Sequence, residues 1–201
     1  ALGKEPVKTP AIDELISNGV LFTQAHIMGG IQGAICMPSR AMLMTGKSLF
    51  HLHADGGYIP ENNIMMPEFF RKQGYITFET GKWHNGAASL NRAFADADNI
   101  YIGGMHRYET GGHLTPVLHH YDSSGAYKNS FTGNKFSSVY YADAIISFLD
   151  KQKESNKPFF AYAAFTSPHD PRTPPEAFAA WYDSSKLKLP PNFVSLHPFD
   201  N

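Results

Sequence analysis

The sequence predicts an α/β fold in which a largely parallel central sheet is flanked by helices. Helical patterns alternate along the chain with short apolar segments. The clearest of these segments is Phe159–Phe165, which has no polar–apolar alternation and is typical of a parallel strand covered on both faces. Such alternation of helices and strands indicates the α/β class. The 201 residues are enough for one sizeable core, and we expect one domain.

Proline near the start of a helical pattern and glycine just after its end mark the boundaries of several helices. By these signals and by apolar spacing, we expect helices over Thr9–Gly19 (with Thr9 as N-cap), Pro38–Thr45, Met66–Gln73 and Ser137–Lys153. Strands are expected over Val20–Thr23, Tyr75–Thr80 and Phe159–Phe165. The Gly-, His- and Asn-rich region 87–135 is expected to be mostly loop, and the chain beyond Pro168 to be irregular.

The composition argues against several classes of function. Seventeen Lys and Arg residues nearly balance eighteen Asp and Glu residues, so no polybasic surface for nucleic acid or a membrane is expected. No apolar run is long enough to span a bilayer. Cys36 is the only cysteine, which excludes a disulfide within the chain.

The segment Cys36–Gly46 places a cysteine directly before a predicted helix. Unpaired backbone N–H groups and the positive end of the helix dipole favour a thiolate and attract oxyanions at such a position. Arg40, one turn into the helix, adds a planar cation suited to an oxygen-rich group. The alternative is an inert buried cysteine beside a surface arginine, which is the usual state of a lone cysteine.

Two further polar segments follow predicted strands, where open α/β sheets bind their ligands. In Gly81–Gly86, alternation along an extended chain would place Lys82 and His84 on the same side. The alternative there is a solvated lysine beside a half-buried tryptophan and histidine. In Ser167–Arg172, two prolines flank His169, which could equally be an ordinary loop histidine.

Other polar residues carry weaker signals. His106, His113, His119 and His120 show no metal-ligand spacing with a third ligand, and we expect them to be surface histidines. The alternative is that some of them line a substrate pocket, since loops over such a sheet usually set specificity. Asp96 and Asp98 are expected in a turn, because the glycine and distal glutamate of a calcium loop are absent. Asp170 is expected to brace its loop, and Arg172 is either a surface charge or a substrate contact.

The string Cys36-Met-Pro-Ser-Arg-Ala-Met-Leu-Met-Thr-Gly46 resembles the sulfatase signature, in which Cys-x-Pro-Ser-Arg is followed by four residues and Thr-Gly. Gly-Lys-Trp-His at 81–84 and Pro-His-Asp-Pro at 168–171 are similar to two further family motifs. The resemblance covers nearly the whole chain and implies an alkaline phosphatase-like fold. It also implies hydrolysis of sulfate monoesters, plausibly on carbohydrates.

The resemblance implies a role for each motif residue. A maturation enzyme oxidises the family's cysteine, here Cys36, to formylglycine, whose hydrated aldehyde binds a divalent cation and attacks sulfur. Ca²⁺ is the implied cation, with Mg²⁺ as the alternative. Arg40, Lys82, His84 and His169 are then catalytic, and Lys82, His84, His169 and Arg172 contact the substrate. His169 is the candidate general acid for the leaving alcohol.

The resemblance also implies that residues 1–201 are the N-terminal portion of a single catalytic domain. The family's first strand, which ends in an Asp pair, would precede Leu2-Gly3, and a second Asp-Asn pair would follow residue 201. We do not assign Asp200 and Asn201 as ligands, and we expect the segment alone to be inactive. Export to the bacterial periplasm or medium is implied by the family.

Two other functions are compatible with the same residues. Some relatives with this cysteine motif hydrolyse phosphonate monoesters or phosphodiesters. A non-catalytic fragment or pseudo-enzyme that only binds a ligand or partner is the third hypothesis.

Overall fold

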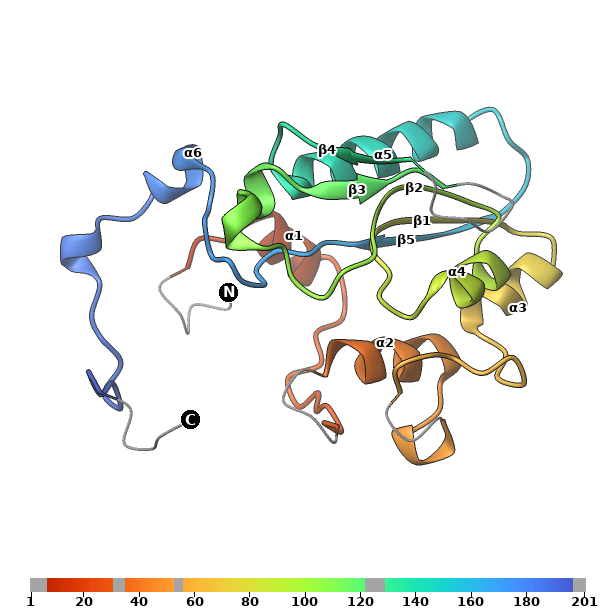
Figure 1. Ribbon diagram of the computed structural model, residues 1–201, viewed down its shortest axis with the longest axis horizontal. Coiled ribbons are helices and arrows are strands. Elements are labelled where there is room, and N and C mark those ends of the chain that lie inside the picture. The colour runs from red at the N-terminus through yellow and green to blue at the C-terminus, as the bar shows by residue number, and fades with distance from the viewer. Residues whose placement is uncertain (1–6, 31–34, 53–55, 122–128, 197–201) are drawn as a thin grey trace.

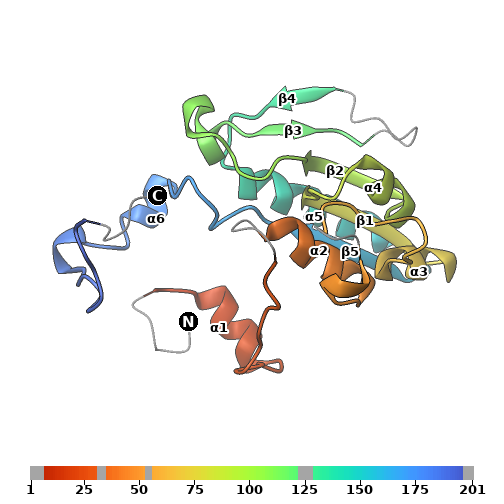
Figure 2. The same cartoon turned by 60° about the horizontal axis from the view of Figure 1, so that its bottom comes forward.

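The computed structural model describes residues 7–30, 35–52, 56–121 and 129–196. Five strands form one sheet in the order β4-β3-β2-β1-β5 (Figures 1 and 2). They are β1 (Ile76–Lys82), β2 (Asp96–Tyr101), β3 (Val117–His119), β4 (Ser130–Thr132) and β5 (Phe159–Ala164). Strand β1 pairs in parallel with β2 and β5, whereas β3 and β4 extend the sheet in antiparallel pairs. The predicted α/β class is confirmed.

Helices cover both faces of the sheet (Figure 2). Helix α5 lies on one face, and α2, α3 and α4 lie on the other, while α1 and α6 lie away from the sheet. The α-helices are α1 (Pro10–Ser17), α2 (Cys36–Thr45), α3 (Met66–Lys72), α4 (Ala87–Ala93), α5 (Ser137–Gln152) and α6 (Glu176–Ala179). Single 3₁₀ turns are η1 (Leu49–His51), η2 (Tyr108–Thr110), η3 (Gly112–Leu114) and η4 (Ser184–Lys186).

Each face of the sheet has its own apolar cluster. Under α5, Phe78 stacks on Phe148 with ring centroids 4.4 Å apart. On the other face, Trp83 is fully buried and meets Phe94 edge to face, with centroids 5.5 Å apart. Aromatic pairs in these geometries add about 0.5–1.5 kcal/mol beyond the burial of their area. The two clusters hold β1 between layers of helices.

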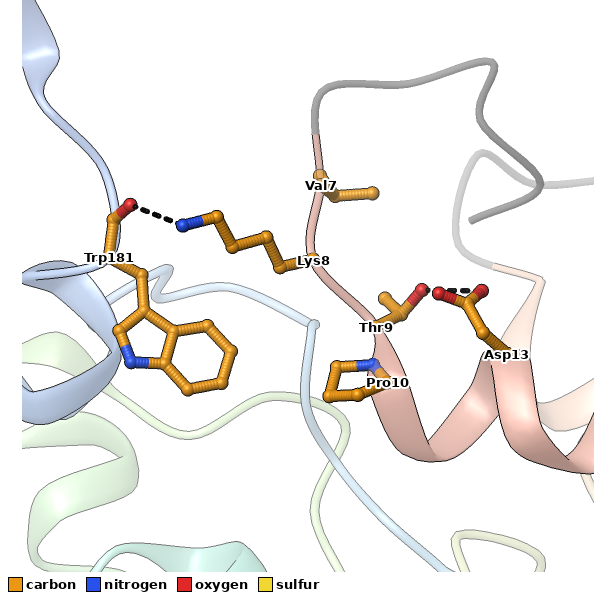
Figure 3. A pocket seen from close by; sticks show the side chains of 6 residues that line it. All are labelled: Val7, Lys8, Thr9, Pro10, Asp13 and Trp181. Carbon is orange, nitrogen blue, oxygen red and sulfur yellow. Dashed lines mark hydrogen bonds between the residues drawn. The ribbon is translucent and has the colours of Figure 1, made fainter.

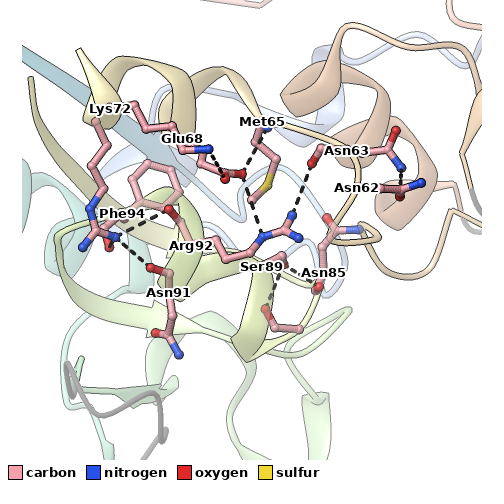
Figure 4. A network of polar contacts seen from close by, with 12 residues as sticks. Asn62, Asn63, Met65, Glu68, Lys72, Asn85, Ser89, Asn91, Arg92 and Phe94 are labelled. Atoms are coloured by element: carbon pink, nitrogen blue, oxygen red, sulfur yellow. Dashed lines mark hydrogen bonds and ion pairs between the residues drawn. The ribbon is translucent and has the colours of Figure 1, made fainter. Parts of the chain in front are cut away.

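A polar network joins α3 to α4 and to the chain before α3 (Figure 4). Glu68 pairs with Lys72 at 3.1 Å and lies 3.8 Å from Arg92 Nε. Arg92 Nη2 also donates to the carbonyl of Asn63 at 3.3 Å, and Arg71 donates to the carbonyl of Asn91 at 2.8 Å. These bonds fix the helical layer that borders the chain after β1.

The four predicted helices are present, with ends within a few residues of those expected. Region 87–135, predicted to be mostly loop, contains α4, β2, β3 and β4, which the sequence analysis missed, and its other described residues lie in 3₁₀ turns or irregular chain. Asp96 and Asp98 lie in β2 and not in a turn. Each of these carboxylates accepts the N–H of the next residue at 2.9 Å. Aspartate side chains form such local bonds most often in turns, which is why the sequence suggested a turn here.

Two strand predictions need correction. Val20–Thr23 is not a strand: Val20 is 84% and Phe22 79% exposed, and an apolar run without a pairing partner has no reason to be extended. Phe159–Phe165 contains β5, which pairs in parallel as expected. It is the edge strand of the described sheet, so its residues are mostly half-buried and not fully covered. Within the described ranges, no helix has the length and hydropathy needed to cross a membrane.

Gly81 of β1 lies directly against Ala164 of β5. Its φ is +99°, and a Cβ there would lie 2.3 Å from the carbonyl oxygen of Ala164. Gly74 also has a positive φ, +86°, but a Cβ there would meet nothing within 4 Å.

We therefore expect Gly81→Ala to lower the thermal unfolding midpoint much more than Gly74→Ala. Positive φ alone costs about 1–3 kcal/mol at both positions, and only Gly81 adds the collision with β5. Calorimetry of the two variants measures the difference. Equal shifts would mean that β1 and β5 are not this close.

Candidate active site

Cys36 is the first residue of α2, so the helix begins two residues earlier than predicted. The N–H groups of the first helical turn have no partners within the helix, and the helix dipole is positive at this end. The opposite end closes at Gly46, whose φ of +66° forms the left-handed cap expected after Thr45. Cys36 is half-buried and is a free thiol.

Arg40 joins α2 to the sheet. Its Nη1 donates to the carbonyl of Lys82 at 2.6 Å, at the end of β1, and to the hydroxyl of Tyr162 on β5 at 3.0 Å. The interpretation of Arg40 as a plain surface charge is therefore wrong. With these two bonds the guanidinium holds the N-terminal turn of α2 against the carboxyl ends of two parallel strands.

Asn85 makes a second connection between α2 and the chain after β1. It is 1% exposed, and its Nδ2 donates to the carbonyls of Met37 at 3.1 Å and Gly56 at 3.3 Å. The backbone carbonyl of Asn85 accepts from the hydroxyl of Ser89 at 2.7 Å, which connects Asn85 to α4 (Figure 4). Asn85 thus fixes the backbone beside Cys36.

Lys82 ends β1 and is 2% exposed, which excludes the solvated-lysine alternative. Its Nζ donates to the carbonyl of Gly104 and is within hydrogen-bonding reach of the Cys36 thiol. Burial lowers the pKa of Lys82; Cys36 opposes that shift, and Arg40 adds to it. A cation this poorly solvated gains strongly from an anionic partner.

His84 lies against the same cysteine, with Nδ1 3.2 Å from Cys36 Sγ. Simple alternation does not put it there, because the register shifts between Thr80 and Gly81 and His84 has a φ of +69°. Burial, together with the charges of Lys82, Arg40 and His169, lowers its pKa to about 4. The imidazole is therefore neutral near pH 7, and one of its nitrogens is a proton acceptor.

His169 follows β5 in an exposed turn, in which its N–H donates to the carbonyl of Thr166 at 2.9 Å. A positive charge on His169 contributes to the lowered pKa of His84. Arg172 is 80% exposed, and its Nε lies 2.9 Å from Asp170 Oδ1 within the same turn. The role of Asp170 as a brace of its loop stays a prediction.

A divalent cation is not accommodated by the described residues alone. The groups around Cys36 are two cations and a neutral imidazole, whereas Ca²⁺ takes six to eight oxygen ligands. The described part of the chain contains no group of three or more His, Cys, Asp or Glu side chains that could hold a metal ion. Asp200 and Asn201 lie outside the described residues, as does Leu2-Gly3.

The burial of three polar residues near the site was not predicted from the sequence. His106 and His113 are 4% and 2% exposed, so the surface assignment was wrong for both. Glu79 is fully buried, and in the described structure neither carboxyl oxygen has a hydrogen-bond partner. Burial raises its pKa well above the ordinary value, against the opposing charge of Arg40. A glutamate in the middle of a predicted apolar strand was the available signal.

An open pocket elsewhere contains none of these residues (Figure 3). It is lined by the segment before and into α1, together with Trp181. Lys8 Nζ donates to the carbonyl of Trp181 at 3.3 Å across it. The chemistry-bearing residues gather instead at the carboxyl ends of β1 and β5.

Comparison with known proteins agrees with this geometry. The sequence profile of the sulfatase family matches residues 1–191. The chain belongs to the sulfatase family.

Individual sulfatases match most of this chain but only part of their own length. The ulvan-active sulfatase of Formosa agariphila is 29% identical over 197 residues, covering 94% of this chain and 36% of that protein. Iduronate 2-sulfatase of Mus musculus is 26% identical over 211 residues, with the same two coverages. The crystal structure of YidJ from Bacteroides fragilis superposes with a TM-score of 0.61 at 24% identity, covering 84% of this chain and 40% of that one. The fold is therefore the alkaline phosphatase-like fold of sulfatases, and the chain spans about a third of the curated relatives' length.

His106 provides a test of the polar layer beneath the site. Burial lowers its pKa to about 4 from an ordinary 6.5, with help from His113, Lys82 and His169. Between these two pH values the His106 position binds more protons in the unfolded state than in the folded state. The stability that neutral His106 contributes is therefore fully present above pH 6.5 and is lost as the pH falls toward 4. His106→Phe keeps a ring against Tyr101, and we expect it to flatten this dependence in urea unfolding experiments. An unchanged pH slope would contradict the assignment.

Proposed function

We propose that the protein hydrolyses sulfate monoesters, plausibly on carbohydrates, with a formylglycine formed from Cys36 as the nucleophile. The observation that supports this most directly is the position of Cys36, at the start of α2 between His84 Nδ1 and the Lys82 ammonium. The names of several relatives refer to sulfates of N-acetylgalactosamine and iduronate, which supports the carbohydrate class.

The nucleophile would be a hydroxyl of the hydrated aldehyde at position 36. This hydroxyl loses its proton to solvent, and its oxygen forms the new bond to sulfur while the bond from sulfur to the ester oxygen breaks. The second hydroxyl then loses its proton, the bond from carbon to the sulfated oxygen breaks, and the aldehyde re-forms as sulfate leaves. Neutral His84, 3.2 Å from the present sulfur atom, is the group suited to accept that proton.

The positive charge of the site would bind the sulfuryl group. Lys82 is buried and faces Cys36, so its ammonium can meet charge on the sulfuryl oxygens without competing water. Arg40 adds a fixed positive charge beneath, although its Nη1 donates to the Lys82 carbonyl and the Tyr162 hydroxyl. Arg40 therefore acts in this scheme by placing α2 and by its field.

His169 is proposed as the proton donor to the leaving alcohol. Its Nδ1 lies 3.2 Å from the carbonyl of Asp170; a carbonyl only accepts, so Nδ1 carries a hydrogen in this contact. A proton on Nε2 is then the one available to the ester oxygen. Arg172, at the exposed end of the same turn, is proposed as a substrate contact and not as a catalytic residue.

The complete enzyme would also need groups that the described residues do not supply. Ca²⁺, or Mg²⁺, bound with the formylglycine oxygen would offset charge on the sulfuryl group, with carboxylates from elsewhere as its ligands. Residues 1–201 are proposed to be the N-terminal portion of one catalytic domain. A formylglycine-generating enzyme would be the maturation partner, and export from the cytoplasm is proposed from family membership.

A phosphonate monoester or phosphodiester hydrolase is the alternative activity, because the same nucleophile and cations suit a phosphoryl group. A protein that binds without turnover is the alternative of another class. Assays of the matured complete enzyme with an aryl sulfate and an aryl phosphodiester separate all three. Higher kcat/KM on the sulfate supports the proposal, whereas the reverse order, or binding without turnover, overturns it.

Conversion of Cys36 is directly measurable. We expect mass spectrometry of the peptide spanning Cys36, after co-production with a maturation enzyme, to show a lighter species that reacts with aldehyde reagents. Cys36→Ala should abolish both that species and turnover. An intact thiol under conditions that convert a control sulfatase would remove the proposed mechanism.

Lys82→Met in the complete enzyme should lower kcat by about a hundredfold or more, because it removes a donor to charge that develops in the transition state. The methionine keeps most of the buried volume, so the unfolding midpoint should change little. Arg172→Ala, at an exposed position, should have a milder effect. Near-normal kinetics of Lys82→Met on several sulfate esters would show that the anion lies elsewhere.

A further inference from the structure

We infer that His113 is a positioning residue for His169, held in place by a chain of buried side chains from α5, from the segment after β5 and from the segment before η2. The inference rests on the proposed role of His169 as proton donor to the leaving group. His113 lies in η3 and is 2% exposed. Its Nε2 is 2.9 Å from the backbone carbonyl oxygen of His169, 56 residues further along the chain.

The direction of this bond is fixed by chemistry. A carbonyl oxygen can only accept, so Nε2 of His113 carries the hydrogen. In a neutral imidazole Nδ1 is then an acceptor, and it lies 2.9 Å from the hydroxyl of Ser137 at the start of α5. Ser137 is fully buried, and its O–H is the donor that Nδ1 requires. Both nitrogens of His113 are thereby satisfied.

The chain continues through two more side chains with a consistent direction. Ser137 Oγ is 3.2 Å from Thr166 Oγ1, which is itself 3.2 Å from His106 Nε2. Because the pKa of His106 is lowered to about 4, its ring is neutral near pH 7 and donates one hydrogen. His106 then donates to Thr166, Thr166 to Ser137, and Ser137 to His113. Thr166 Oγ1 also lies 3.4 Å from His113 Nδ1, within the same cluster.

The turn that carries His169 depends on this cluster. Two further hydrogen bonds of His169 are local, to the carbonyls of Thr166 and Asp170. Packing supports the same contact, because a Cβ on Gly112 would lie 2.6 Å from Pro171. The bond from His113 therefore joins an exposed turn to the buried layer between η3 and α5. Misplacement of a catalytic group by about 1 Å can lower rates a hundredfold.

The experiment compares two substrates of the matured complete enzyme. 4-Nitrophenyl sulfate has a good leaving group that needs little protonation, whereas an alkyl sulfate has a poor one that needs a general acid. A group that only supports folding would affect both substrates equally. Misorientation of the His169 imidazole should lower kcat on the alkyl sulfate more than on 4-nitrophenyl sulfate.

We expect His113→Leu to lower kcat on the alkyl sulfate by about tenfold or more, with a smaller loss on the nitrophenyl ester. His169→Ala should show the same selectivity, more strongly. His113→Gln, whose amide N–H can reach the same carbonyl, should recover most of the lost rate. Ser137→Ala should shift rates in the same direction by less, and it serves if His113→Leu does not fold.

Phe148→Leu is the matched control. It perturbs the apolar cluster under α5 without touching the turn, so it should lower the unfolding midpoint and leave the ratio of the two rates unchanged. If His169→Ala is selective but neither His113→Leu nor Ser137→Ala is, the inference is wrong and the proposed function stands. If the wild-type enzyme hydrolyses neither sulfate ester, the proposed function fails and the inference with it.

Discussion

The structure around Cys36 depends on the bond from Arg40 to the end of β1. Helix α2 packs Ala41 and Met44 into the apolar cluster on this face of the sheet, and Arg40 Nη1 reaches both the Lys82 carbonyl and the Tyr162 hydroxyl. A parallel sheet leaves its last carbonyls without partners in the ladder, and a guanidinium is well shaped to bind them. Asn85 makes a similar bond in the other direction: it lies just after β1, and its side-chain amide donates to the carbonyl of Met37 in α2. Arg40, from α2, and Asn85, from the chain after β1, thus hold the turn that carries Cys36 against the ends of β1 and β5.

The same arrangement concentrates positive charge where water is scarce. Arg40 and Lys82 lie at one strand end, and burial together with these cations keeps His84 neutral. Buried charges of one sign repel each other and are poorly solvated, so the folded chain bears a cost that a bound anion relieves. Glu79 does not offset this positive charge, because its carboxyl oxygens have no hydrogen-bond partner in the described structure and burial favours its neutral form. The site is therefore organised for an anion in advance, which favours transition states in which negative charge grows.

Much of this site was predictable because its motifs are short and local. A cysteine before Pro-Ser-Arg at a helix start, and Gly-Lys-Trp-His after a strand, place their residues through nearby chain geometry. The helices were predictable for the same reason. Two features were not: the inference that Lys82 and His84 share a side assumed simple alternation, whereas a register shift and a φ of +69° bring His84 to Cys36. The burial of His106 and His113 depends on residues more than twenty positions away, which no local pattern reveals.

The failure over region 87–135 has a physical cause that bears on function. Its glycines weaken hydrophobic periodicity, so the sequence resembles a loop, yet these residues permit close approach. A Cβ at Gly104 would lie 3.2 Å from the His84 ring, and one at Gly112 would lie 2.6 Å from Pro171. The Gly104 carbonyl accepts from Lys82, and the residue after Gly112 donates to His169. One glycine-rich segment therefore touches both halves of the site, the strand end below Cys36 and the turn that carries the proposed proton donor. Larger residues at these two positions would separate the halves without altering any of the three sequence motifs.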